Sequence, residues 1–143
     1  MNFKNIHIGQ MVKKGVTESG IEISRICNFM KCTEEEINQM YLLENLPTDV
    51  LLKLSKLLEY DFFRLYSQHL IFYAPPSAAR VAKNEKTQLP QFRKNIYTKE
   101  VINFILEQIS IGEMTKYEVI EKYKIPKTTL YKWISKYKNE SKQ

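Results

Sequence analysis

The chain has 143 residues, enough for one ordinary domain or two small ones, and its 43% hydrophobic and 27% charged residues are typical of a folded protein. Lys and Arg outnumber Asp and Glu by 22 to 16, and this net charge of +6 favours an anionic partner such as nucleic acid. The chain has only four glycines, which argues against glycine-rich phosphate loops and turn-rich β folds. It has no apolar run of about 18 residues, which argues against a membrane span. Because the first residues carry no apolar signal stretch, we expect a cytoplasmic protein without a membrane partner.

The positive charge is unevenly distributed along the chain. Residues 1–73 hold 8 basic and 9 acidic side chains, a net charge of −1, and residues 74–90 hold 3 and 1, a net charge of +2. Residues 91–143 hold 11 and 6, a net charge of +5. This asymmetry indicates a nucleic-acid-binding module in the second half, beside a nearly neutral domain.

A change of composition separates the two halves. An aromatic run ends at Tyr73, and Ala74-Pro75-Pro76-Ser77 and a polar stretch follow. Two adjacent prolines cannot continue a helix, and this stretch has no apolar periodicity. The sequence therefore predicts a first domain over 1–73, a Pro-containing linker over 74–95 and a second domain over 96–143.

The first half predicts five short helices from apolar residues at helical spacing, and no segment alternates as a strand would. Thr33 and Glu36 have the spacing of a capping box at the start of the third helix. The fifth helix begins at Asp61. Its expected inward residues are Phe62, Leu65, Tyr66 and Leu70.

The second half predicts three helices, which makes the whole chain all-α. Thr98 caps the first of them, and Thr115 with Glu118 forms a second capping box. Lys124-Ile125-Pro126 is a tight turn before the last helix. The apolar stripe of that helix consists of Leu130, Trp133, Ile134 and Tyr137.

The segment from Ile125 to Ile134, with its Thr-Leu-Tyr-Lys-Trp core, resembles the homeodomain-like helix-turn-helix of insertion-sequence transposases. In such domains the apolar stripe of the last helix packs on the other two helices, and its opposite face enters the major groove. The resemblance implies that Lys127, Thr128 and Lys132 face bases and that Tyr131 contacts a phosphate. Thr129 and Lys136 complete the predicted DNA-binding set. The alternative is that these residues form only a solvated face.

The first half resembles the five-helix domains of the Cro and repressor class. The resemblance rests on Ile8-Gly9, Gly20-Ile21, Ile26-Cys27, Thr33 and the segment from Pro47 to Leu58. It implies two small helix-turn-helix domains in one chain.

The first half departs from this pattern where such domains read DNA. Ile23 replaces the usual Gln, and Glu34-Glu35-Glu36 would be repelled by phosphates. Asn38 and Gln39 could still read adenine. We favour protein–protein contact over DNA reading for this domain.

The end of the first half carries more aromatic surface than one short helix can hide on one face. A small domain with so much exposed apolar surface usually has a partner, so we expect a homodimer. The alternative is that these residues cap the core of their own domain. The predicted dimerisation residues are Phe62, Tyr66, Leu70, Phe72 and Tyr73.

No set of residues predicts catalysis or metal binding. Cys27 and Cys32 are expected to be buried reduced thiols, and His7 and His69 lack the spacing of metal ligands. The carboxylates lie on predicted helix surfaces and not on a sheet that could hold two metal ions. We therefore expect no metal, no cofactor and no enzymatic activity.

The sequence thus predicts a protein that binds duplex DNA sequence-specifically. The favoured role is the recognition of element ends in a bacterial mobile element, beside a separate catalytic transposase subunit. A stand-alone transcriptional regulator of the repressor type is the first alternative. A protein-interaction adaptor without DNA binding is the second.

Overall fold

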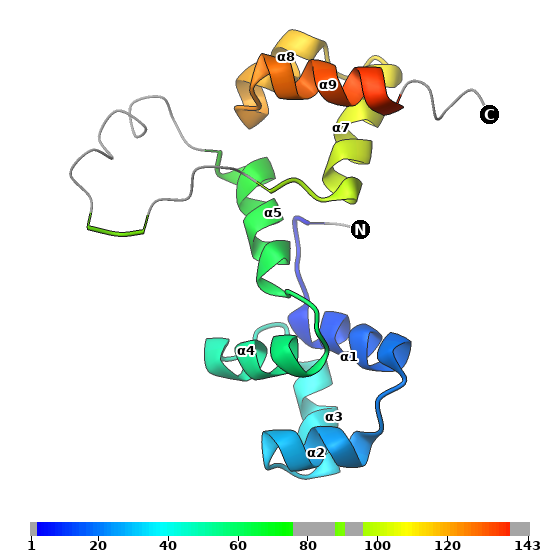
Figure 1. Cartoon of the computed structure of the whole chain (residues 1–143), viewed down its shortest axis with the longest axis vertical. Helices are drawn as coiled ribbons and strands as arrows, with labels where there is room; N and C mark the ends of the chain where they lie inside the picture. The colour runs from blue at the N-terminus through cyan, green and yellow to red at the C-terminus, as the bar shows by residue number, and fades with distance from the viewer. Residues whose placement is uncertain (1–2, 76–87, 91–95, 138–143) are drawn as a thin grey trace. The chain divides into compact units, whose positions relative to one another are not determined.

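The computed structural model describes residues 3–75, 88–90 and 96–137 of the chain (Figure 1). These residues form eight helices and no strand. The all-α fold class predicted from the sequence is confirmed. Most of the predicted linker, residues 76–87 and 91–95, lies outside the described residues.

The described residues group into two compact units. The N-terminal unit ends at Ser67, and the C-terminal unit begins at Gln68. The division falls inside a continuous helix, α5 (Phe63–Tyr73), whereas the sequence suggested a boundary after this helix.

The N-terminal unit contains α1 (Ile8–Ser19), α2 (Ile23–Met30), α3 (Glu34–Leu42), α4 (Thr48–Leu57) and the first part of α5. Its five helical segments agree with the five expected. One buried apolar face from each element forms the core. The buried residues include Ile8, Val12, Ile26, Ile37, Leu51, Leu54, Phe62 and Leu65.

Helix α1 begins directly against the end of α3. The amide of Ile8 donates to the carbonyl oxygen of Glu44, and the amide of Gly9 donates to that of Leu43, both at 3.1 Å. The first amides of a helix and the carbonyls at the end of another have no partners within their own helices. Each end therefore supplies the hydrogen bonds that the other lacks.

The three predicted helix caps are confirmed, whereas the fifth helix begins at Phe63 and not at Asp61. The amide and hydroxyl of Thr33 donate to the Glu36 carboxylate at 2.7 and 3.1 Å, and the Glu36 amide donates back to the Thr33 hydroxyl. Thr115 and Glu118 repeat this capping box at 2.7 and 2.8 Å. Thr98 caps its helix through its side chain, as expected.

The C-terminal unit contains α7 (Lys99–Ser110), α8 (Lys116–Tyr123) and α9 (Lys127–Tyr137). The three helices agree with those expected for the second half. Their apolar stripes meet in one core. The buried residues are Val101, Ile102, Ile105, Val119, Tyr123, Ile125, Leu130 and Trp133.

The second part of α5 also belongs to the C-terminal unit, whereas the sequence predicted the whole helix in the first domain. Gln68 and Ile71 are buried, and the ring of Phe72 packs edge-on against Phe104 and Tyr123, with centroids 5.1 and 5.4 Å apart. This unit therefore has a fourth helical segment beside the three expected ones.

Two expectations about burial are wrong. Leu70 is 56% exposed, and Ile71 occupies the buried position instead, because the second part of α5 packs in a different core from the first. Cys27 and Cys32 are free thiols, but both are only partly buried. Burial, followed by the nearby Cys27 and Glu36, raises the pKa of the Cys32 thiol.

The capping boxes make stability depend on pH. The hydrogen bonds from the Thr115 amide and hydroxyl hold the pKa of Glu118 below its ordinary value. A lowered folded-state pKa contributes stability that is fully present above the unfolded pKa, about 4.3, and is lost as the pH falls through the folded value. We expect Glu118→Gln to remove this part of the acid dependence, because the amide cannot ionise. The check is the free energy of unfolding from pH 7 to 3: the advantage of the wild type over the variant should shrink on acidification, and a constant difference would contradict the account.

Candidate nucleic-acid interface

The candidate site is built on α8, α9 and the short turn between them. Lys124 ends α8 in the left-handed conformation, with φ of 52°, and Ile125 is 1% exposed. The carbonyl of Pro126 then accepts from the amides of Thr129 and Leu130 at 2.9 and 3.1 Å. The left-handed residue reverses the chain, the buried isoleucine anchors the turn, and the proline carbonyl begins α9.

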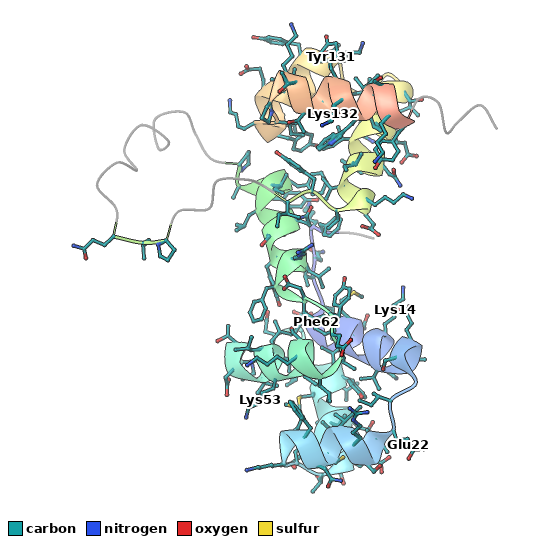
Figure 2. The ribbon with its side chains drawn as sticks, in the orientation of Figure 1. Lys14, Glu22, Lys53, Phe62, Tyr131 and Lys132 are labelled. Atoms are coloured by element: carbon teal, nitrogen blue, oxygen red, sulfur yellow. The ribbon has the colours of Figure 1, made fainter. Side chains whose placement is uncertain are left out.

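Helix α9 divides cleanly into a buried and an exposed face. Leu130 and Trp133 are buried, at 0% and 8% exposure. At about 100° per residue, Thr128, Lys132 and Ser135 lie on the opposite side, and all three are exposed. Figure 2 labels Lys132 and Tyr131 on this helix. The structure therefore keeps the predicted reading residues Thr128 and Lys132 on one accessible face.

A cluster of two lysines around a tyrosine lies along one edge of that face. Tyr131 is 45% exposed, and its ring centroid lies 5.7 Å from the Lys127 ammonium and 5.3 Å from that of Lys116. Such distances allow cation–π attraction. The sequence predicted Lys127 and Tyr131 as part of this site but not Lys116, which directly follows the capping residue of α8.

The remaining predicted residues lie on the other edge of α9. Lys136 is exposed, and its ammonium lies 5.4 Å from the ring centroid of Tyr137. Thr129 is half-buried, which leaves it less accessible than Thr128. The exposed face thus has a polar centre with lysines on both edges.

The charge of this two-helix element is positive. Residues 115–137 contain six lysines and two glutamates, a net charge of 6 − 2 = +4. The Glu118 carboxylate accepts the Thr115 hydrogen bonds, and that of Glu121 lies 3.6 Å from the Lys124 ammonium. Helix α9 contains no acidic residue. Both carboxylates of the element are therefore engaged locally, and its potential favours a polyanion.

The N-terminal unit contains a second two-helix element with a connection of the same length and a charge of the opposite sign. Helices α2 and α3 are joined by three residues that begin with Lys31, which is also left-handed, with φ of 57°. Residues 22–42 contain two basic and four acidic side chains, a net charge of 2 − 4 = −2. Asn38 and Gln39 are exposed on α3, one turn after Glu34 and Glu35. These two candidate DNA-reading residues therefore lie beside carboxylates that oppose phosphate.

The structure separates the five predicted dimerisation residues. Phe62 is 1% exposed in the N-terminal core, and Phe72 packs on Phe104 and Tyr123 of the C-terminal unit. Tyr66 is half-buried, whereas Leu70 and Tyr73 are 56% and 51% exposed. Phe62 and Phe72 therefore serve the chain's own packing, and the homodimer stays a prediction.

No group of three or more His, Cys, Asp or Glu side chains that could hold a metal ion occurs in the described part of the chain. None of the described helices is long and apolar enough to cross a membrane. No protein-family model matches the chain, and comparisons with curated proteins and with solved structures found no match.

Proposed function

We propose that this protein binds duplex DNA sequence-specifically through the exposed face of α9, and that its activity is binding and not catalysis. The observation that carries the proposal is the accessible face centred on Thr128 and Lys132, opposite the buried Leu130 and Trp133. Lysines border this face on both edges, and no carboxylate of α9 opposes an approaching phosphate.

The dimensions of α9 suit the major groove. Its 11 residues span about 16 Å at 1.5 Å per residue. A helix with its side chains is about 10–12 Å across, which matches a groove about 12 Å wide. In this mode Lys132 donates to guanine O6 and N7, while the Thr128 hydroxyl reaches a neighbouring base edge. Lys116, Lys127 and Lys136 lie at the edges of the face, and we assign all three to the phosphate backbones. For Lys127 this replaces the base contact that the resemblance implied.

Two biological roles use this activity. The resemblance of the segment from Ile125 to Ile134 to insertion-sequence transposases supports recognition of the ends of a bacterial mobile element, beside a separate catalytic transposase subunit. The resemblance of the first half to repressors supports transcriptional regulation as the second candidate. A catalytic transposase gene next to the gene for this chain favours the first role, and its absence favours the second.

The direct test of the proposed activity is selection from random duplex DNA with the full chain. We expect a defined sequence to be enriched over successive rounds and to be retained in direct binding measurements. Failure to enrich any sequence, together with no binding of any duplex at low salt, would contradict the proposal and leave the adaptor alternative.

Substitutions of two lysines test the division of roles on α9. We expect Lys132→Ala to cost about 1–3 kcal/mol on the preferred site and far less on scrambled DNA, because a contact to a base edge is lost. Lys136→Ala should weaken both duplexes alike, because a phosphate contact carries no sequence information. The affinities of both variants for both duplexes, with folding checked by circular dichroism, measure the difference. Equal losses on both duplexes for Lys132→Ala would make it a phosphate contact.

A further inference from the structure

The side chain of Gln68 is a buried polar group that joins α5 to the start of α7. It is 1% exposed, and its amide nitrogen donates to the carbonyl oxygen of Ile96 at 2.7 Å. Its amide oxygen accepts from the backbone amide of Thr98 at 3.2 Å. One side chain therefore satisfies two backbone groups that lie 28 and 30 residues away along the chain.

The residue between these two backbone groups contacts the candidate DNA-binding helix. The Tyr97 ring meets the Trp133 ring edge-on, with centroids 4.8 Å apart and planes at 78°. Trp133 is the buried anchor of α9 and lies next to Lys132 in the chain. A continuous series of contacts thus leads from Gln68 through Tyr97 to Trp133.

We infer that Gln68 is a positioning residue for DNA binding, an inference that rests on the proposed function of α9. Its two hydrogen bonds fix the backbone on both sides of Tyr97, and the Tyr97 ring supports Trp133. The orientation of the exposed face of α9 depends on the position of the Trp133 ring in the core. Base contacts tolerate little displacement, so a shift of this support weakens sequence-specific binding before it unfolds the helix.

Only a side chain that donates and accepts at the same time suits this position. An ionised carboxylate at residue 68 would accept from Thr98 but face the Ile96 carbonyl without a proton to donate. A protonated carboxyl group would again do both. Because burial disfavours the charged form of a carboxyl group, a glutamate here should protonate at a pH above its ordinary pKa.

The experiment compares Gln68→Glu with the wild type in the full chain at pH 8 and pH 5. Trp133 is the only tryptophan, so its emission reports this site directly. At pH 8 we expect the variant's emission to shift to longer wavelength and its affinity for the selected duplex to fall about 10-fold, the equivalent of a lost hydrogen bond. At pH 5 both should return toward the wild-type values. His69 and Lys99 are ionisable chain neighbours of this site, and the wild type measured at both pH values corrects for any effect of pH that does not arise at residue 68.

A second variant tests the positioning role if Gln68→Glu does not fold at pH 8. Tyr97→Leu keeps the backbone groups that Gln68 binds but removes the ring from Trp133. It should change the emission and lower the affinity while helicity is retained. Unchanged emission and affinity in either folded variant would overturn the positioning role. If the wild type binds no duplex, the proposed function fails, and the emission of the two variants still decides whether Gln68 and Tyr97 position Trp133.

Discussion

Gly9→Ala is expected to unfold the N-terminal unit. A Cβ atom at this position would lie 2.5 Å from the carbonyl oxygens of Met40 and Leu43 and 2.7 Å from that of Tyr41. These are backbone atoms that cannot rotate away, so α1 and α3 must separate. Their separation also breaks the hydrogen bonds from Ile8 and Gly9 to the end of α3. Overpacking of roughly 1–3 kcal/mol and two hydrogen bonds of about 1 kcal/mol each are a large part of a small unit's stability.

Gly20→Ala is the matched control for this substitution. Gly20 has a positive φ of 65°, but a Cβ atom there would have nothing within 4 Å. The cost should therefore be only the left-handed strain of about 1–2 kcal/mol. Thermal unfolding followed by circular dichroism measures both variants. If Gly9→Ala is no more destabilising than Gly20→Ala, the close approach of α1 and α3 does not exist in solution.

Trp133→Ala is expected to unfold the C-terminal unit. The ring is 8% exposed and packs against Tyr97, and large-to-small changes at buried aromatic positions cost about 3–5 kcal/mol. Domains of this size have total stabilities of only about 5–15 kcal/mol. We expect amide hydrogen exchange in α7, α8 and α9 to become fast, with DNA binding lost on every sequence.

Tyr131→Ala provides the comparison for Trp133→Ala on the same helix. Tyr131 is 45% exposed and lies between the Lys116 and Lys127 ammonium groups. Its loss should leave the exchange rates of α7 and α8 nearly unchanged and affect only DNA affinity. Slow exchange in Trp133→Ala would show that the packing of this ring is not what holds the unit together.

The helices and their caps could be predicted from the sequence because they depend on near neighbours. The capping boxes of Thr33 and Thr115 involve residues three positions apart. The exposed face of α9 follows from helical periodicity in the same way. Both the caps and the exposed face depend on residues that lie within a short segment, and the structure contains both.

The features that sequence reasoning missed depend on distant residues. Gln68 binds backbone groups 28 and 30 residues away, and Phe72 packs on Phe104 and Tyr123. No local pattern shows that the second part of α5 packs in another unit. The place of Lys116 beside Tyr131 also depends on how α8 packs on α9. The aromatic run at the end of the first half therefore predicts a partner surface, although part of it serves the chain's own core.

The two similar helix–turn–helix geometries in this chain differ in charge. The α2–α3 element has a net charge of −2, and the α8–α9 element has a net charge of +4. Both turns begin with a left-handed lysine, Lys31 and Lys124. Because both connections have three residues and the same left-handed first residue, the charge of the exposed face distinguishes the partners that the two elements favour. This contrast supports DNA for the second element and a protein for the first.

The salt dependence of duplex binding tests the central claim most directly. Each phosphate contact that a lysine makes contributes about −0.9 to the slope of log affinity against log salt concentration. We predict a steep negative slope for the full chain, a slope shallower by about one unit for Lys136→Ala, and the wild-type slope for Lys53→Ala, an exposed lysine on α4. Salt-independent binding, or an equal effect of Lys53→Ala and Lys136→Ala, would contradict the assignment of DNA binding to α9.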